Sequence, residues 1–595
     1  MAAPLQVQPA APPSRSANWW LGIKRFGGAL SVREDRFFLL LAVLIGVFSG
    51  LSVVCFRMAI EWVHLWLLRS SEAPSILRLL LVPCLAGLVI AIFVKRFFPG
   101  IRGSGVNQTK TAVYISDGEI PFGTVYGKFI CSALAIGAGF SLGPEDPSLQ
   151  IGAGIASVIG RKLRLSRENL RLIAPVGAAA GLAAAFNAPI AAVIFVIEEI
   201  VGRWSSGILG AVVLSAVSSV VVMRGFLGAE PLFRVPQFRL EHPAELLGYA
   251  ALGVFGGLFS LFFVKILAAL RSWLRTLPDW TQYVQPAAAG LLVGIMAIWL
   301  PQVLGAGYYV MDQSMHGRYV WQTLAILALA KVVATSLSFS SGTPGGMFAP
   351  TLFIGAMVGG AIGGLEHHFF PALTGGIGAY ALVGMGTLFA GFLRAPMTSV
   401  FMVLEVSGNY SIIIPVMISN TIAYLISLKY QPVPIFDLLS RQDGVQLPSL
   451  EEEREGSSLR VEDAMRPVPV PPLRAQSAIR DVLPEIEKSA PDWLLIYDPG
   501  RGWLLAHKPE LLEKAKAAAP ETSLAEIAPK GIVPIVHPDN SVDLPLRRLG
   551  DRAFLPVVHR AHPERLVGIV SREDVLRAYA KPDADELPAP AHLDG

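Results

Sequence analysis

Long stretches without any charged residue constrain most strongly what this chain can fold into. The first is residues 37–56, and others occupy 172–197, 204–223, 246–264, 332–365 and 406–428. About 20 apolar residues are enough to cross a bilayer. Composition agrees, because charged residues make up only 16% of the chain and the mean hydropathy is +0.53. We therefore expect an integral, multi-pass membrane protein that lies in a lipid bilayer, and we exclude a simple soluble, disordered or fibrous chain.

The apolar stretches are irregular in length, and many are interrupted by glycine and proline. Non-helical backbone at membrane depth is tolerated only where it is buried in protein or lines a cavity. The pattern therefore predicts an all-α membrane domain of tilted, broken or re-entrant helices. A net charge of +4 argues against a nucleic-acid partner, and three cysteines argue against a disulfide scaffold. No stretch has metal-ligand spacing or a phosphate-loop pattern, so we expect no metal and no required cofactor.

Changes in composition divide the chain into five parts. We expect a cytoplasmic N-terminal segment at 1–35, a transmembrane domain at 36–440 and a polar linker at 441–458. Short alternating β patterns between charged helical stretches then predict a soluble α/β unit at 459–580. The Pro/Ala/Asp-rich tail at 581–595 is typical of disorder.

The membrane part contains an internal repeat. Residues 176–199 align with residues 383–406, and eight of the 24 positions are identical, including an Ala-Pro pair and Glu198/Glu405. A Phe-Ser-x-Gly motif at 140–143 recurs at 339–342, in the same order. Paired segments interrupted by glycine and proline in two halves point to a transporter binding site near the bilayer midplane.

Three segments could hold an anion. The first is Gly103-Ser104-Gly105, where glycines free the backbone amides and a hydroxyl can donate, although a plain turn explains it as well. The second, at 143–148, begins with Gly143 and includes Glu145 and Asp146 before Pro147; Pro147 suits the first helical position and Asp146 its cap. The third, at 342–350, is the repeat-mate of the second and includes Met347 and Phe348. Two helix N-termini aimed at one point would bind an anion through partial charges.

Carboxylates at membrane depth are costly and indicate function. Glu145 lies just outside a predicted helix N-terminus, where it could occupy an anion site and leave it on protonation; an acidic surface turn is the alternative. Glu198 and Glu199 follow an apolar helix and point about 100° apart. One could bond to backbone while the other exchanges protons with the cytoplasm, and an ordinary polar helix end is the alternative.

The ordered set GSGVN, GPEDP, FNAP…EE and GGMFAP resembles the CLC family of chloride channels and chloride/proton antiporters over residues 36–440. The resemblance implies a homodimer in which each subunit has two inverted halves and its own anion pathway. It implies that Glu145 is the gating glutamate and Glu199 the internal proton glutamate. It also implies an anion site at Ser104, Gly143, Met347, Phe348 and Phe436, with Lys128 near the pore.

The sequence departs from the family's pattern at four positions. Pro144 replaces a basic residue and so removes an amide donor and a charge. Asp146 replaces glycine and adds a second carboxylate, which couples to Glu145 if both face the pathway and matters less if Asp146 caps the helix. Asn107 stands where proline is usual, and Phe436 stands where a tyrosine would supply a hydroxyl.

The C-terminal region resembles a pair of CBS domains, which implies a cytoplasmic location. Gly568-Ile569-Val570-Ser571-x-x-Asp574 fits the pattern in which Ser571 and Asp574 would contact an adenine nucleotide. The corresponding place in the first copy holds His507-Lys508-Pro509-Glu510 and is degenerate. A structural role in dimerisation is the alternative to nucleotide binding.

The leading hypothesis is a secondary transporter that exchanges chloride, or a similar monovalent anion, for protons, in a bacterial inner membrane. The alternative is a passive chloride channel, gated by voltage or protons, which needs no Glu199 proton route. A receptor or scaffold that carries no flux fits less well, because Ser104, Glu145 and Glu199 are all present. A membrane enzyme fits less well again, because no nucleophile–base pair or metal-ligand cluster appears in the sequence. Anion selectivity, stoichiometry and direction stay open at this point.

Overall fold

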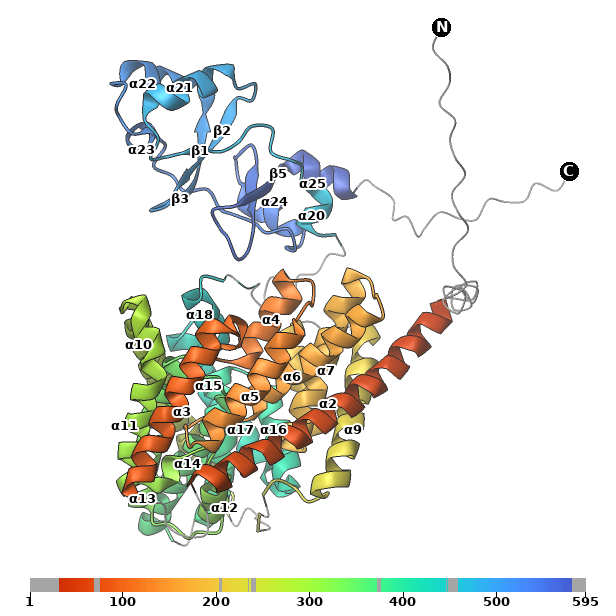
Figure 1. The fold of residues 1–595 in the computed structure, drawn as a ribbon, viewed down its shortest axis with the longest axis vertical. Coiled ribbons are helices and arrows are strands. Elements are labelled where there is room, and N and C mark those ends of the chain that lie inside the picture. Colours follow the sequence, from red (N-terminus) through yellow and green to blue (C-terminus); the bar gives the residue numbers. More distant parts are fainter. Residues whose placement is uncertain are drawn as a thin grey trace, which may run out of the picture.

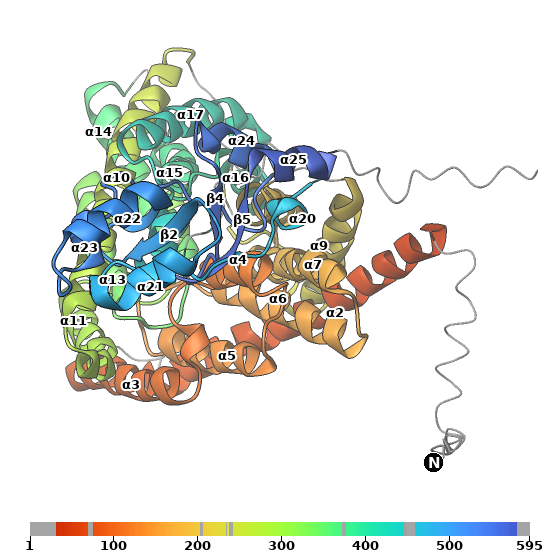
Figure 2. The ribbon, with the colours of Figure 1, turned by 90° about the horizontal axis from the view of Figure 1, so that it is seen from above.

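The computed structural model describes residues 31–68, 75–202, 206–233, 235–236, 242–371, 376–445, 447 and 459–579. Almost all of the predicted N-terminal segment 1–35, most of the linker 441–458 and the whole tail 581–595 lie outside the described residues. The rest forms a helical bundle followed by a smaller α/β region, which lies over one end of the bundle (Figures 1 and 2).

Eight helices in the described part of the chain are long and apolar enough to cross a membrane. This confirms the expected multi-pass membrane protein. The helices of the bundle are α2 (Ser31–Leu68), α3 (Ile76–Arg96), α4 (Gly105–Ile115), α5 (Phe122–Gly137), α6 (Glu145–Lys162), α7 (Arg167–Phe186), α8 (Pro189–Phe195), α9 (Ser206–Leu227), α10 (Glu245–Thr276), α11 (Gln285–Trp299), α12 (Tyr308–Met315), α13 (Trp321–Ser340), α14 (Phe348–Phe369), α15 (Ile377–Leu393), α16 (Pro396–Ser407), α17 (Ile413–Tyr430) and α18 (Ile435–Gln442).

Broken helices occur at equivalent places in the two sequence repeats. Helix α7 ends at Asn187, whose φ of 57° is left-handed, and α8 then begins at Pro189. Helix α15 ends in the same way at Arg394, whose φ is 61°, and α16 begins at Pro396. A left-handed residue closes the first helix and a proline opens the next, so each Ala-Pro pair of the repeat marks a break.

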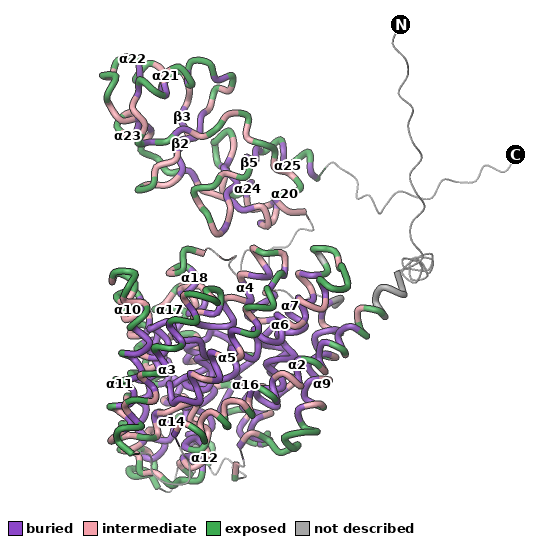
Figure 3. Tube along the Cα trace, viewed as in Figure 1, coloured by how far each residue is buried: buried purple, intermediate pink, exposed green. Residues whose placement is uncertain are grey.

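Apolar side chains on the outside of the bundle and small residues inside it fit a lipid environment. Trp62, Trp66 and Phe255 are exposed on α2 and α10, whereas the centre of the bundle is buried (Figure 3). Glycines let the inner helices approach closely. A Cβ at Gly177 of α7 would lie 2.2 Å from a carbonyl oxygen of α6, and one at Gly384 of α15 would lie 2.4 Å from a carbonyl oxygen of α14.

Each repeat supplies a cap to the other. Both carboxylate oxygens of Glu405 accept from the Ile190 and Ala191 amides at the start of α8, at 3.0 and 2.8 Å. Glu198 accepts from the Thr398 amide at the start of α16, at 3.0 Å. A carboxylate at a helix N-terminus satisfies amides that lack partners within the helix. The identical glutamates of the repeat therefore have the same structural role in opposite halves.

Two buried lysines form a second equivalent pair. Lys128 of α5 donates to the carbonyl oxygens of residues 101 and 103, at 3.1 and 2.6 Å. Lys331 of α13 donates to those of residues 303 and 305, at 2.9 and 2.7 Å. Both side chains are fully buried. Each lysine fixes the loop that precedes a helix of its own half, Lys128 before α4 and Lys331 before α12.

The α/β region consists of two similar units. In the first, β1 (Leu473–Arg474) pairs in parallel with β2 (Trp493–Asp498), which pairs antiparallel with β3 (Gly502–His507). In the second, β4 (Leu555–Val558) pairs antiparallel with β5 (Leu566–Val570), and Val536 forms a parallel bridge to β4. The helices of this region are α20 (Val461–Ala464), α21 (Ile479–Lys488), α22 (Lys508–Ala517), α23 (Leu524–Ile527), α24 (Asp543–Leu549) and α25 (Arg572–Tyr579). Helix α20 is the first helix of the α/β region, but it packs in the core of the second unit.

Candidate functional site

The loops that precede α6 and α14 meet inside the bundle. The Gly143 amide donates to the Gly346 carbonyl oxygen and the Gly346 amide donates to the Gly143 carbonyl oxygen, both at 2.8 Å. These glycines lie at equivalent distances from the helices that follow them. Each is followed within two residues by a helix start, so two helix N-termini come together here, as the sequence predicted. Their unbonded amides and dipoles favour negative charge.

Ser104 brings a third helix start to the same point. It is the N-cap of α4, where its Oγ accepts from the Val106 amide at 3.2 Å. The same hydroxyl donates to Asp146 Oδ2 at 2.9 Å. Ser104 is only 4% exposed. The hydroxyl is therefore directed at a buried carboxylate.

Asp146 does not cap its helix as expected. Helix α6 begins at Glu145, two residues before Pro147, and Pro144 occupies the N-cap position without a side-chain bond. Asp146 is then the second residue of the helix and projects towards other elements. Its Oδ2 also accepts from the Met347 amide, at 3.4 Å. Of the two alternatives left open by the sequence, Asp146 facing the site is the one observed.

Glu145 lies beside Asp146 and has a separate partner. Its Oε1 accepts from the hydroxyl of Tyr308, the first residue of α12. Its Oε2 lies close enough to Gly143 that a Cβ there would be 2.2 Å away. Both carboxylates are completely buried. The first two residues of α6 thus direct two acids to different partners.

The start of α14 is enclosed by aromatic rings. Phe348 is its first residue and contacts the rings of Phe186, Phe195, Phe389 and Phe436, with centroids 5.0 to 6.3 Å away. Phe436, the second residue of α18, is fully buried and lies edge-on to Phe348. Met347 and Phe436, both predicted for the anion site, are therefore neighbours of Phe348, the first along the chain and the second through its ring.

Asn107, which stands where proline is usual in the family, makes two side-chain hydrogen bonds. Its Nδ2 donates to the Phe436 carbonyl oxygen at 2.6 Å and to Ser440 Oγ at 2.7 Å. A proline at this position could make neither bond. The asparagine connects α4 to α18 and so holds the Phe436 ring in place.

Glu199 lies away from this centre, in an ion-pair cluster that the sequence did not predict. It belongs to η3 (Val196–Val201), a wide helical turn after α8 of a kind often found at functional sites. Lys110 Nζ of α4 lies 2.9 Å from Glu199 Oε1 and 3.0 Å from Asp437 Oδ1 of α18. Lys110 and Glu199 are both about 4% exposed. Of the two adjacent glutamates, Glu198 bonds to backbone and Glu199 pairs with a cation.

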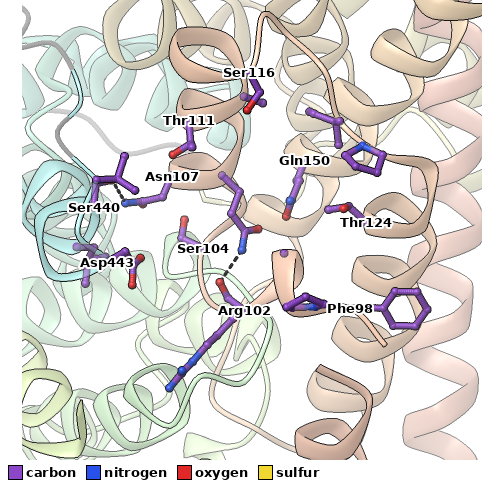
Figure 4. A pocket seen from close by; sticks show the side chains of 18 of the residues that line it. Phe98, Arg102, Ser104, Asn107, Thr111, Ser116, Thr124, Gln150, Ser440 and Asp443 are labelled. Carbon is purple, nitrogen blue, oxygen red and sulfur yellow. Dashed lines mark hydrogen bonds between the residues drawn. The ribbon is translucent and has the colours of Figure 1, made fainter. Parts of the chain in front are cut away.

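A cavity of about 610 Å³ leads from the centre to the surface. Ser104 and Gln150 line its inner end, and the exposed Ser116 and Glu119 line its outer end. Figure 4 shows polar side chains of Asn107, Thr111 and Ser440 along its wall. The lining ends at Asp443 and Val445, just before the chain continues to the α/β region. This passage connects Ser104, which donates to Asp146, to the side of the bundle that faces the α/β region (Figure 1).

Two arginines, Arg102 and Arg271, line this cavity. Arg271 of α10 donates to the Leu439 carbonyl oxygen at 3.1 Å and to Asp443 Oδ1 at 2.8 Å. Arg275 also binds Asp443. Arg102 lines the same wall. The arginines attract anions, whereas Asp443 and Glu119, which also line the cavity, offset their charge.

Ser571 and Asp574 meet at the start of α25. Asp574 Oδ2 accepts from the Ser571 amide at 2.9 Å and from its Oγ at 2.7 Å, while Arg466 lies 3.2 Å away. This is the reciprocal arrangement of a helix capping box. The pair thus has a structural explanation in its present contacts.

The residues missed by the sequence analysis are Lys110, Tyr308 and Asp437. Each is separated from its partner by 89 to 327 residues, so no local spacing connects them. One signal was available for Lys110, because a lysine enclosed in membrane helices indicates a partner.

Broken helices, buried carboxylates and helix N-termini that meet in the interior define a polytopic membrane transport protein. The family model described as "Voltage gated chloride channel" matches residues 86–428. The chain belongs to this family. It is 32% identical over 400 residues to a protein of Ralstonia nicotianae named as chloride channel protein ClcB-like, covering 65% of this chain and 92% of the relative. It is also 32% identical over 416 residues to the H(+)/Cl(-) exchange transporter ClcA of Vibrio campbellii, covering 67% and 88%.

Solved structures agree with the fold. A slow cyanobacterial Cl−/H+ antiporter superposes with a TM-score of 0.64 and 25% identity, covering 68% of this chain and 97% of the other. A eukaryotic CLC transporter superposes with a TM-score of 0.62 and 21% identity, covering 90% and 97%. The second match extends beyond the helical bundle and supports the fold of the α/β region.

Proposed function

We propose that this protein is a secondary transporter that exchanges chloride, or a similar monovalent anion, for protons. The observation that carries the proposal is the meeting of the α6 and α14 N-termini beside Ser104, with Glu145 on one side and Glu199 on another. Partial charges from amides and a hydroxyl bind an anion without holding it too tightly for passage. Two separate buried carboxylates provide the proton steps that exchange requires.

In this proposal, Glu145 is the gate and outer proton acceptor. Its carboxylate is buried beside Gly143 and accepts a hydrogen bond from Tyr308. Protonation would remove its negative charge, so the side chain would bind less tightly in a site that attracts anions. Ser104, Met347, Phe348 and Phe436 would form the surroundings of the central anion. Glu199 would be the inner proton donor, next to Lys110.

Glu199 favours exchange over the passive channel. A channel needs no titratable group buried away from the anion route, yet Glu199 is buried and paired with Lys110. The relatives named as exchange transporters point the same way. The relative named as a chloride channel protein supports the alternative, a passive chloride channel.

A flux assay on purified protein in liposomes tests the proposal. A chloride gradient is imposed without a pH gradient, the voltage is clamped with potassium and valinomycin, and internal pH is followed. We expect chloride to drive protons uphill and Glu199→Gln to abolish proton movement. Glu198→Gln is the matched control, because an amide oxygen can still accept from the α16 amides, and it should retain coupling. Rapid chloride movement without protons in the native protein would establish the channel.

The contacts of the two repeats support further parts of the proposal. Gly143 and Gly346 pair antiparallel at the centre, which is the relation expected for two halves in inverted orientation. We infer a homodimer with one anion pathway in each subunit, in a bacterial inner membrane, from the family resemblance. The α/β region would then lie in the cytoplasm. The cavity lined by Ser104 and Asn107 would open on the same side of the membrane.

We further infer that the α/β region is a pair of CBS domains, since its two units repeat a strand–strand–helix order. An adenine nucleotide at Ser571 and Asp574 is the ligand to test. Added ATP or AMP at about 100 times its Kd would stabilise the fold by about 2.7 kcal/mol and raise its melting temperature. An unchanged melting temperature would favour the structural role that the capping contacts already explain.

A further inference from the structure

We propose that Asp146 is a resident anion, a carboxylate of the chain itself that occupies the place between Ser104 and Met347 and must leave before chloride binds there. The inference rests on the proposed function, because it concerns the same anion site. It adds a competitor that the family pattern, with glycine at this position, does not contain.

The donors around Asp146 are those expected to bind the transported anion. Its Oδ2 accepts from the Ser104 hydroxyl at 2.9 Å and from the Met347 amide at 3.4 Å. Ser104 caps α4 and Met347 caps α14, so both donors come from the starts of other helices. One oxygen anion is therefore bound at the convergence of helix N-termini, while belonging to a third helix.

Capping of its own helix does not account for this position. Asp146 does not cap α6, whose N-cap Pro144 makes no side-chain bond. Among the described residues it forms no ion pair, because Lys128 directs its amine to the carbonyl oxygens of residues 101 and 103. Its second oxygen, Oδ1, is buried and has no hydrogen-bond partner in the described part of the chain. A carboxylate that is half satisfied in the interior is costly.

The site is filled by Asp146, and a cavity reaches one of its two donors. A Cβ at Gly346 would lie 3.1 Å from both Asp146 Cβ and Cγ, so little space remains beside the side chain. Ser104 also lines the cavity of about 610 Å³, and so does Gln150, one turn after Asp146 on α6 (Figure 4). An anion in the cavity can therefore approach Ser104, the donor that Asp146 occupies.

Chloride and the carboxylate compete for the same donors, so Asp146 weakens chloride binding whenever it is charged and in place. The titratable groups that interact with it electrostatically are Glu145 on its own helix and Lys128 on α5. Protonation of Asp146 removes its charge and lets chloride enter. Chloride affinity is therefore expected to rise with acidity in a way that depends on this side chain.

The test is chloride binding to the purified full-length protein, measured by isothermal titration calorimetry at neutral and at acidic pH. We expect Asp146→Asn and Asp146→Gly to bind chloride at least about tenfold more tightly than the native protein at neutral pH, which corresponds to ~1.4 kcal/mol. The difference should shrink in acid. Asp481→Asn, at an exposed position on α21 of the α/β region, is the matched control. In a bromide-soaked crystal at neutral pH, an anomalous peak between Ser104 and Met347 should appear for Asp146→Asn and be absent for the native protein.

The outcomes separate this inference from the proposed function. Equal chloride affinity and equal pH dependence in native protein and both variants would overturn the resident anion and leave exchange standing. Chloride binding by none of the proteins would contradict both. Tighter binding by the variants, combined with chloride flux that carries no protons, would sustain the resident anion and overturn exchange. If Asp146→Asn fails to fold, Asp146→Gly restores the family's residue and carries the same comparison.

Discussion

Lys110 lies between carboxylates from two other elements, Glu199 of η3 and Asp437 of α18. Its ammonium group is almost fully buried, as is Glu199. Buried ion pairs stabilise little compared with apolar packing, but removal of one member leaves an uncompensated charge. At the scale of single residues, the inner end of the site therefore depends on this lysine more than on either acid.

Replacement of Lys110 by methionine should reduce the free energy of unfolding by about 3–5 kcal/mol, because two acids then lose their cation. The double variant Lys110→Met/Glu199→Gln should recover part of this loss. Melting temperatures in detergent measure both effects, with the exposed Lys162→Met as control. Equal melting temperatures for Lys110→Met and Lys162→Met would show that the cluster contributes nothing to stability.

Residues in local motifs could be predicted, and residues whose roles depend on distant contacts could not. The convergence of Ser104, Gly143 and Met347 follows from glycines and helix starts that the sequence displays. The direction of Asp146 does not, because Pro147 indicated a helix start two residues later than the observed one. Tyr308 and Asp437 carry no local pattern, and only the folded chain brings them to Glu145 and Lys110.

At the scale of elements, the helices around the site are held at close distance by glycines. Gly152 of α6 faces Gly177 of α7, and Gly355 of α14 faces Gly384 of α15, each against backbone. Backbone atoms cannot move aside as side-chain ends can. The two crossings therefore fix where the N-termini of α6 and α14 lie.

Gly177→Ala and Gly384→Ala should each destabilise the protein by about 3 kcal/mol or more, since the new methyl group would overlap a carbonyl oxygen. Gly225→Ala is the matched control, because no atom lies within 4 Å of a Cβ built there on α9. That change should be neutral or stabilise by about 0.5–1 kcal/mol. Gel filtration and thermal unfolding distinguish the cases. If all three variants behave alike, close packing at the crossings does not limit stability.

The apolar stretches predicted the existence of membrane helices better than their lengths. Residues 37–56 are only part of α2, which continues to Leu68 through charged positions. Charged residues at helix ends can extend beyond the apolar core of a bilayer, so charge alone does not mark the boundary. The breaks before Pro189 and Pro396 were visible, because proline and the repeat mark both.

At the scale of the whole molecule, the bundle and the α/β region have separate hydrophobic cores. Helix α20 precedes the first unit in the sequence but packs against the second unit. Val461 is completely buried in that unit, and its amide donates to the Asn540 carbonyl oxygen at 2.9 Å. Arg466 and Ile569 exchange two backbone bonds at 3.0 Å.

A fragment of residues 459–579 should therefore fold alone, whereas residues 467–579 should unfold at a markedly lower temperature. The shorter fragment loses a buried valine, worth about 1.5–3 kcal/mol. It also loses the five backbone hydrogen bonds that join residues 459–466 to the second unit. Circular dichroism melts of the two fragments measure the difference. Identical melts would show that α20 only rests on the second unit.

The exchange of caps between Glu198 and Glu405 has a consequence for how the protein is made. The Ala191 amide of α8 donates to Glu405, which lies 214 residues further along the chain. During synthesis the first half enters the membrane before the α8 amides have a carboxylate partner. The second half supplies that partner, Glu405, once it has been inserted. Two half-length chains made together in one cell should accordingly find each other, while either chain made alone should be degraded.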